Sequence, residues 1–283
     1  MLFDRRQLVG LAAAGAASLV LPRSVALAGG DAATGFLDHF SAQGFETLEP
    51  LSLITDYGFN GGLRYDDTRP SYPDGPSACV QPACRVEDAE LAGTPGVLAL
   101  FNIMVVNVPD QDRSGEIVER LVTYAVENGG LDPERLVFVS TDLFEPYRSD
   151  SELLQKGQFV RRELNEAMAT GDGSGFFAPV GHPNTPSFPT VSVHYPLNGG
   201  ASGELSYPLP GYLEIGEIAL ADEKSAMPGP IGGGFGLERL ALAAGKPAPD
   251  FAESRTAFLE IAKLEATQTD KPLPSGYETY AGM

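Results

Sequence analysis

The chain contains few cysteines, histidines and basic residues for its length, and it has no tryptophan. Among 283 residues there are 2 cysteines, 3 histidines and 19 lysines and arginines, against 38 aspartates and glutamates. The net charge of −19 repels phosphate backbones, which argues against general nucleic-acid binding. No His or Cys pair with suitable spacing accompanies the two cysteines, so we expect no metal site.

The sequence also lacks a hydrophobic run long enough for a comfortable transmembrane helix. Its N-terminal apolar stretch, residues 8–21, is short and rich in alanine. The pair Arg5–Arg6 precedes this stretch, and the small residues at 26–28 follow it as a cleavage site, which is typical of a twin-arginine export signal. We therefore predict a signal peptide over residues 1–28 and a single exported domain, periplasmic or extracellular, over residues 29–283. The alternatives are a mis-assigned start codon, which would leave the protein in the cytoplasm, and an uncleaved anchor.

The two cysteines, Cys79 and Cys84, lie close together in the stretch SACVQPACR. Outside the cytoplasm such a pair could close a small disulfide-bonded loop. The sequence alone leaves this pairing open.

Apolar residues follow a helical spacing in some segments and an extended pattern in others. Strands and helices do not alternate in a regular βαβ order along the chain, which indicates an α+β domain built on a largely antiparallel sheet. The predicted helices lie within 35–48, 115–130, 149–171, 237–245 and 253–266, and the predicted strands within 96–108, 134–144, 188–197 and 211–220.

A glycine run in residues 232–242, GGGFGLERLAL, leads directly into a helix with Glu238 and Arg239 in its first turn. It could be a packing turn or a helix start that binds phosphate. Its third interpretation, a synthetase signature motif, depends on the segments that precede it in the chain.

Those segments occur in the order found in the catalytic domain of alanyl-tRNA synthetase, a class II aminoacyl-tRNA synthetase, and the chain resembles that domain from Gly35 to about Glu260. VQPACRVEDAELAGT resembles motif 2, with Arg85 where the family has an arginine that grips the ATP α-phosphate. GGGFGLERLAL resembles motif 3, with Arg239 at the position that contacts the γ-phosphate. The resemblance implies a class II synthetase-like antiparallel sheet flanked by helices. The other matching segments are FLDHFSAQGFETLEPLSLI, RLVTYAVENGGLDPERLVFVSTDLFEPY, TPSFPTVSVHYP and YLEIGEI.

The resemblance further implies that ATP and Mg²⁺ are used to activate a small amino or carboxylic acid. Arg85 and Arg239 would act in catalysis by holding the triphosphate, because a guanidinium stays charged and binds phosphate through parallel donors. Glu238 would help to position Mg²⁺. Gly234 and Gly236 would let the backbone approach the nucleotide closely.

Several positions depart from the family pattern. Where the family has an Arg-His-His stretch, residues 96–98 of this chain are Gly-Val-Leu. Gly232 replaces the aspartate that binds the substrate's amino group in the family. Ser192 replaces an acid, and Gly216 and Glu217 replace tryptophan and asparagine. Gly232 and Glu217 remain candidate substrate-binding positions. Glu217 could recognise a cation, although a solvated glutamate at a strand edge is the simpler interpretation.

Three functions stay open. The two retained arginines slightly favour a stand-alone ligase that activates a small acid without charging tRNA, since the charge is negative and no chain is left for a tRNA-recognition domain. The apolar replacement at 96–98 favours an exported, non-catalytic protein that binds a small ligand. A different exported enzyme could use Asp66, Asp67 or Asp74 as a base or cation site. A homodimer is an expectation from the family alone, and the histidines His39, His182 and His194 share no motif and are expected to be structural or exposed.

Overall fold

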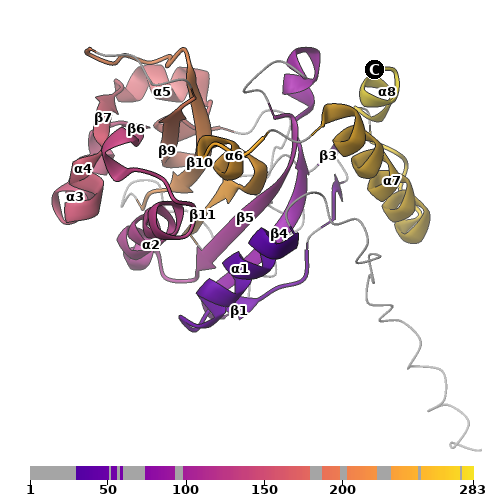
Figure 1. Ribbon diagram of the computed structural model, residues 1–283, viewed down its shortest axis with the longest axis horizontal. Coiled ribbons are helices and arrows are strands. Elements are labelled where there is room, and N and C mark those ends of the chain that lie inside the picture. Colours follow the sequence, from indigo (N-terminus) through magenta and orange to yellow (C-terminus); the bar gives the residue numbers. More distant parts are fainter. Residues whose placement is uncertain are drawn as a thin grey trace, which may run out of the picture.

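One large sheet organises the chain, with helices packed against it (Figure 1). Its strands follow the order β1-β4-β5-β11-β10-β9-β6-β7, and β8 pairs with β9 outside this path. Strands β1 and β4, and strands β6 and β7, are parallel, while the other pairs are antiparallel. The computed structural model describes residues 30–50, 52–55, 58–59, 74–92, 98–178, 187–197, 203–221, 231–247, 250–274 and 276–283.

The strands differ widely in length, and the long ones lie in the middle of the sheet. A separate two-stranded sheet is formed by β2 (Ile54–Thr55) and β3 (Gly58–Phe59). The strands of the large sheet are β1 (Glu46–Thr47), β4 (Ser77–Cys84), β5 (Leu100–Val108), β6 (Val137–Ser140), β7 (Gln158–Arg161), β8 (Phe176–Phe177), β9 (Phe188–Pro196), β10 (Tyr212–Ala219) and β11 (Ile231–Gly236).

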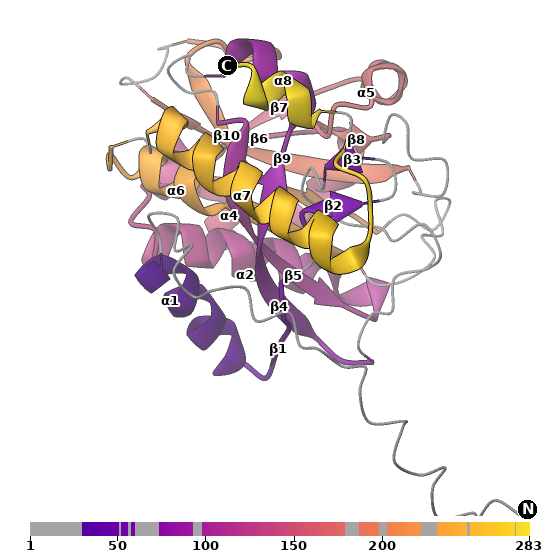
Figure 2. The same cartoon turned by 90° about the vertical axis from the view of Figure 1, so that its right-hand side faces the viewer.

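Helices pack against the sheet in two separate hydrophobic cores. The longer helices are α1 (Gly30–Ser41), α2 (Ser114–Glu127) and α7 (Phe251–Thr269), and the shorter ones are α3 (Glu145–Ser149), α4 (Glu152–Lys156), α5 (Leu164–Thr170), α6 (Leu237–Ala243) and α8 (Tyr277–Ala281). Apolar residues of α1 and α2 share the main core with one face of the sheet, whereas α7 and α8 share a second core with the adjoining ends of β4 and β5. Figure 2 shows α7 crossing β4 and β5.

A buried carboxylate fixes α7 to the segment that leads into β2. Glu265 is 2% exposed, and its carboxylate accepts hydrogen bonds from Ser52 Oγ at 2.6 Å and from the backbone N–H groups of Leu53 and Ile54 at 3.1 and 3.0 Å. Hydrogen bonds to a charged acceptor are stronger than neutral ones. The helix is thus attached through its own polar residue as well as through apolar packing.

The predicted α+β class with a mostly antiparallel sheet flanked by helices is confirmed. The predicted strands at 96–108, 188–197 and 211–220 correspond to β5, β9 and β10, and the predicted helix at 253–266 lies within α7.

The single helix predicted over residues 149–171 is wrong. The segment instead forms α4, β7 and α5, and β7 pairs in parallel with β6. Gly157 ends α4 in an extended conformation, and a Cβ there would lie 2.6 Å from the ring of Phe138. The strand pairing and this close approach override the helical spacing of the apolar residues.

The helix predicted within residues 35–48 also ends earlier than expected, at Ser41. Gly44 has a φ of +86°, which reverses the chain before Phe45 and β1. Phe45 still joins Phe36 and Phe40 in the main core, because the turn folds it back against the helix. The apolar spacing therefore continues past the residue at which the helix ends.

The disulfide left open for Cys79 and Cys84 is not formed. Both cysteines are buried thiols outside any disulfide bond. They lie an odd number of residues apart on the regular strand β4, so their side chains point to opposite faces of the sheet. Cys79 belongs to an apolar cluster with Phe101 and Val105, and Cys84 belongs to the core beneath α7.

We therefore expect both thiols to be unreactive in the native protein. Burial raises the pKa of the Cys79 thiol to about 12, so the reactive thiolate is scarce at pH 8. A thiol-titrating disulfide reagent is expected to label neither cysteine in buffer and both in urea. Protein that shows no free thiol in urea without reductant would contradict this arrangement.

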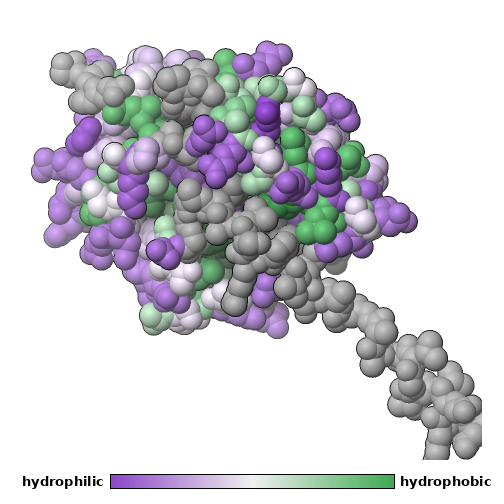
Figure 3. Space-filling view, turned by 45° about the vertical axis from the view of Figure 1, so that its right-hand side comes forward, coloured by the Kyte–Doolittle hydropathy of each residue, from purple (hydrophilic) through white to green (hydrophobic). Residues whose placement is uncertain are grey.

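No helix among the described residues is both long and apolar enough to span a membrane. On the face drawn in Figure 3, hydrophilic residues predominate, and hydrophobic residues occur in smaller groups between them. This surface agrees with the acidic composition of the chain.

Candidate functional site

The two faces of the central sheet differ in chemistry. On β9 and β10, Val191, Val193 and Ile218 point into the main core. The opposite face carries Ser192 and His194 of β9, which pair with Glu217 and Glu214 of β10. This polar face is the candidate site.

A β-bulge brings the two glutamates to the same face. The register of β10 against β9 shifts between Glu214 and Gly216, so that Ile215 is the extra residue. Without the bulge, residues three apart on a strand would point to opposite faces. The bulge therefore concentrates two carboxyl groups on one side of the sheet, which an alternating sequence pattern does not predict.

Arg239, at the start of α6, points into this face and is bonded to the protein backbone. It is 7% exposed, and its guanidinium donates to the carbonyls of Glu214 and Leu98, each at 3.1 Å. The guanidinium also lies 4.7 Å from the centre of the Phe101 ring. Arg239 thereby joins the beginning of β5 to β10, and the stretch ending at Leu98 is the one that departs from the family pattern.

Arg85 follows β4 and approaches the same ring. Its guanidinium lies 5.6 Å from the Phe101 ring centre and 3.8 Å from the Glu214 carboxylate. The side chain keeps an exposed fraction of 26%. The structure therefore brings the two predicted catalytic arginines to one aromatic ring, and Arg85 approaches the carboxylate of Glu214 while Arg239 bonds its carbonyl.

Glu238 is directed at the backbone of β5. Its carboxylate accepts hydrogen bonds from the backbone N–H and the side-chain amide of Asn102, both at 2.7 Å. Burial raises the pKa of this carboxyl, while the bonds from Asn102 lower it. Both carboxylate oxygens thus have a partner within the fold, and the predicted role in positioning Mg²⁺ stays a prediction.

Glu217 is not at a strand edge, because β10 lies between β9 and β11. The interpretation as a solvated strand-edge glutamate is therefore wrong. Its Oε1 is buried and has no hydrogen-bond partner in the described part of the chain. Burial raises the pKa of Glu217 to about 8, with further contributions from the nearby charges of Glu214 and Asp172, and Arg85 opposes the shift.

A glycine-rich turn at residues 172–175 covers the carboxyl of Glu217. A Cβ on Gly173, whose φ is +85°, would collide with Glu217 Oε2. Asp172 fixes the turn by accepting from Arg162 Nη1 at 2.8 Å and from Tyr207 Oη at 3.1 Å. The apolar pattern of the sequence does not predict this turn, although two glycines around Ser174 are a recognisable turn signal.

A chain of hydrogen bonds runs below the turn. Ser192 Oγ lies 2.9 Å from both Ser174 Oγ and His194 Nε2. Burial lowers the pKa of His194, and the proximity of Arg239 lowers it further, while Glu214 opposes this shift. His194 is therefore neutral at pH 7 and serves as a buried structural histidine, as the absence of a motif suggested.

The glycine run occupies strand β11 in the middle of the sheet, where the sequence analysis expected a turn or helix start. A Cβ on Gly232 would collide with Asn107 Oδ1, and a Cβ on Gly234 would collide with the carbonyl oxygen of Met104. Gly236 is backed by the side chain of Arg239. These glycines allow close approach of protein groups, and contact of Gly232, Gly234 or Gly236 with a ligand stays a prediction.

Some predicted residues fall outside the described chain, namely Asp66, Asp67, His182, and the Gly96 and Val97 that precede Leu98. Asp74 is described and exposed. Within the described residues, no cluster of three His, Cys, Asp or Glu side chains could hold a metal ion.

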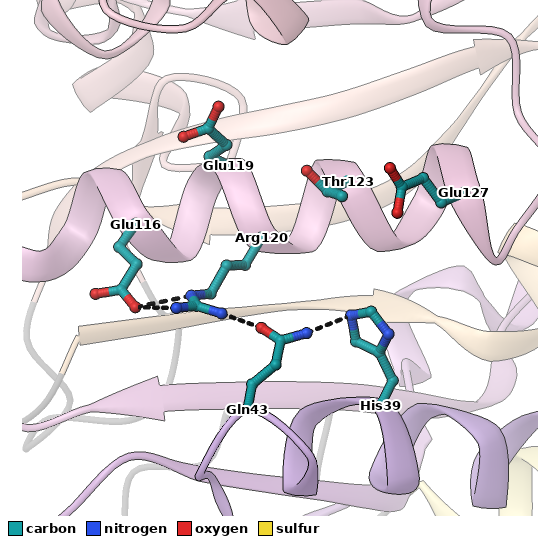
Figure 4. Close-up of a pocket in the computed structure, with 7 residues that line it drawn as sticks. All are labelled: His39, Gln43, Glu116, Glu119, Arg120, Thr123 and Glu127. Atoms are coloured by element: carbon teal, nitrogen blue, oxygen red, sulfur yellow. Dashed lines mark hydrogen bonds and ion pairs between the residues drawn. The ribbon is translucent and has the colours of Figure 1, made fainter.

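A second concave region lies between α1 and α2 (Figure 4). Its polar groups pair with one another: Glu116 bonds Arg120 at 2.7 Å, Arg120 bonds Gln43, and Gln43 bonds His39 at 2.6 Å. This chain connects the end of α1 to α2, so its groups already have partners. The residues lining the region are His39, Gln43, Glu116, Glu119, Arg120, Thr123 and Glu127.

Comparison with known proteins finds distant similarity among solved structures. No protein-family model and no curated protein sequence matches the chain. Among solved structures, the chain is similar to an aspartyl tRNA synthetase from Entamoeba histolytica, with 15% sequence identity and a TM-score of 0.37 over 81% of this chain. The chain spans 56% of the length of that synthetase. A likeness this distant carries no argument about activity, so alanyl-type specificity, ATP binding and export stay predictions.

Proposed function

We propose that this protein binds a small ligand on the polar face of its central sheet and does not activate that ligand with ATP. The observation that carries the proposal is the environment of Arg239. Its guanidinium donates to two backbone carbonyls and stacks on Phe101, so it is used inside the fold. An arginine that holds a triphosphate instead needs its donors directed at the ligand.

The charges on this face support the same proposal. Glu214 and Glu217 lie on the polar face, and Arg85 is already close to Glu214. Asp172 lies at its border and is paired with Arg162. A nucleotide triphosphate with its negative charges would meet these carboxylates, whereas a neutral or cationic ligand would not be repelled.

Export fits a protein of this kind. We propose that residues 1–28 direct the chain out of the cytoplasm as a twin-arginine signal. A protein that only binds a small ligand needs no ATP at its destination. The strongly negative charge supports the absence of tRNA as a partner, and pairing of two copies remains an expectation from the family resemblance.

ATP-dependent activation of a small amino or carboxylic acid is the second candidate. One observation favours it: the Arg85 side chain keeps a 26% exposed fraction, and its contact with Glu214 is long, at 3.8 Å. A phosphate could displace such a contact at small cost, because partly exposed ion pairs are weak.

Calorimetric titration with Mg·ATP distinguishes the two candidates. We expect no saturable heat up to about 1 mM nucleotide, which corresponds to a binding free energy weaker than about −4 kcal/mol. The matched variant is Arg85→Ala, which should give the same null titration. Saturable binding by the wild-type protein that Arg85→Ala abolishes would overturn the proposal in favour of the ligase.

A further inference from the structure

We propose that Glu217 binds the protonated amino group of a small organic amine, beside the turn at residues 172–175 that lies against its carboxyl. This inference rests on the proposed function, because it names the chemical class of the ligand. It begins from an oxygen that the described part of the fold leaves without a partner, Oε1 of Glu217.

The position of the carboxyl is fixed from both sides. Strand β10 is held between β9 and β11, and the carboxyl lies against the backbone of Gly173. The turn itself is held in place, since Asp172 accepts from Arg162 and Tyr207, and Thr190 Oγ1 donates to the carbonyl of Gly173. Because the turn and the strand are both held in place, the carboxyl of Glu217 has little freedom to move toward another partner.

Among the described residues no ion pair forms with Glu217, because the charged groups around it have closer partners. Glu214, on the same strand, is next to Arg85 from the end of β4. Asp172, on the turn, is paired with Arg162 at 2.8 Å. The neighbouring β9 contributes His194, which is neutral, and α6 contributes Arg239, whose guanidinium is bonded to carbonyls.

An ammonium group supplies what the site lacks. A buried carboxylate is costly unless it is paired and hydrogen-bonded, and otherwise it takes up a proton. A primary ammonium carries one positive charge and three N–H donors, and so could pair with Oε1. The two arginines already have acids or carbonyls beside them, so the site favours an amine over a carboxylic acid.

Binding of an amine should release a proton from the protein. Glu217 has a pKa of about 8 and is mostly protonated at pH 7, whereas the bound form requires the carboxylate. The affinity for a cation should therefore rise about tenfold per pH unit between pH 6 and pH 7. A ligand that merely accepts a hydrogen bond from the protonated carboxyl would bind with nearly constant affinity over this range and more weakly above a pH of about 8.

The test uses propylamine with two isosteres, propionate and 1-propanol, measured by calorimetry on the full chain. We expect saturable binding of propylamine alone, release of close to one proton at pH 7 in buffers of different ionisation heat, and at least a tenfold loss of affinity in Glu217→Gln. The control Glu134→Gln replaces an exposed glutamate and should bind propylamine as the wild type does.

Failure of this inference can be told apart from failure of the proposed function. If propionate or 1-propanol binds and propylamine does not, the amine assignment falls and a ligand site without ATP survives. Equal affinity of wild type and Glu217→Gln for propylamine would also overturn the assignment. An absence of binding by all three probes counts against it as well, whereas saturable Mg·ATP binding would overturn the proposed function itself.

Discussion

Replacing Glu217 with glutamine is expected to make the free protein markedly more stable at high pH than the wild type, with much less difference at low pH. The folded protein holds the proton of Glu217 up to a pKa of about 8, against a reference value of 4.5. Between these values the unfolded chain has lost that proton and the folded chain has kept it, so wild-type stability falls as pH rises. One pKa unit corresponds to about 1.4 kcal/mol, which gives a full effect on the order of 5 kcal/mol by pH 9.

Urea unfolding at pH 5, 7 and 9 measures this effect. The free energy of unfolding of Glu217→Gln minus that of the wild type should increase steadily over this range. The surface variant Glu134→Gln controls for the general effect of removing one negative charge, and its difference from the wild type should stay nearly constant. A constant difference for Glu217→Gln would show that its carboxyl titrates as an ordinary exposed glutamate.

Replacing Arg239 with alanine is expected to lower the free energy of unfolding by about 4 kcal/mol at pH 7. The substitution removes two hydrogen bonds, leaves the carbonyls of Leu98 and Glu214 without their donor, and opens a space beside Phe101. Arg239→Lys should recover only part of the loss, because an ammonium is a single point of charge and cannot reproduce the planar guanidinium.

Arg85→Ala is the matched control for this measurement, since both arginines approach Phe101 but Arg85 is partly exposed. Its cost should stay below about 1 kcal/mol. If Arg239→Ala does not fold, the Arg239→Lys variant still gives the comparison. Equal unfolding free energies for Arg239→Lys and the wild type would contradict the structural role of this guanidinium.

The long apolar strands could be predicted from the sequence, because a buried segment must carry apolar side chains along its length. The strands predicted within 96–108 and 188–197 correspond for that reason to β5 and β9. The single helix predicted over 149–171 is wrong because β7 is short and pairs with β6, which is distant from it in the sequence. A local pattern carries no information about such pairing.

The sequence predicts the two arginines of the site, but not Glu214 or the turn at residues 172–175. Motif order identified Arg85 and Arg239, and the structure places both beside Phe101. Their hydrogen-bond partners could not be predicted, because the donors of Arg239 go to backbone carbonyls, which a side-chain motif does not specify. The burial of Glu217 likewise depends on a bulge in β10 and on a turn that lies some forty residues earlier in the chain.

The polar face of the sheet holds a buried carboxyl oxygen, Oε1 of Glu217, that has no partner among the described residues. Carbon-13 NMR titration of the glutamate carboxyls in the wild type and in Glu217→Gln tests it most directly. We expect one carboxyl that titrates near pH 8 in the wild type and is missing from the variant. If every glutamate in the wild-type protein titrates near the usual value of about 4.3, the carboxyl is solvated or already paired, and the account is contradicted.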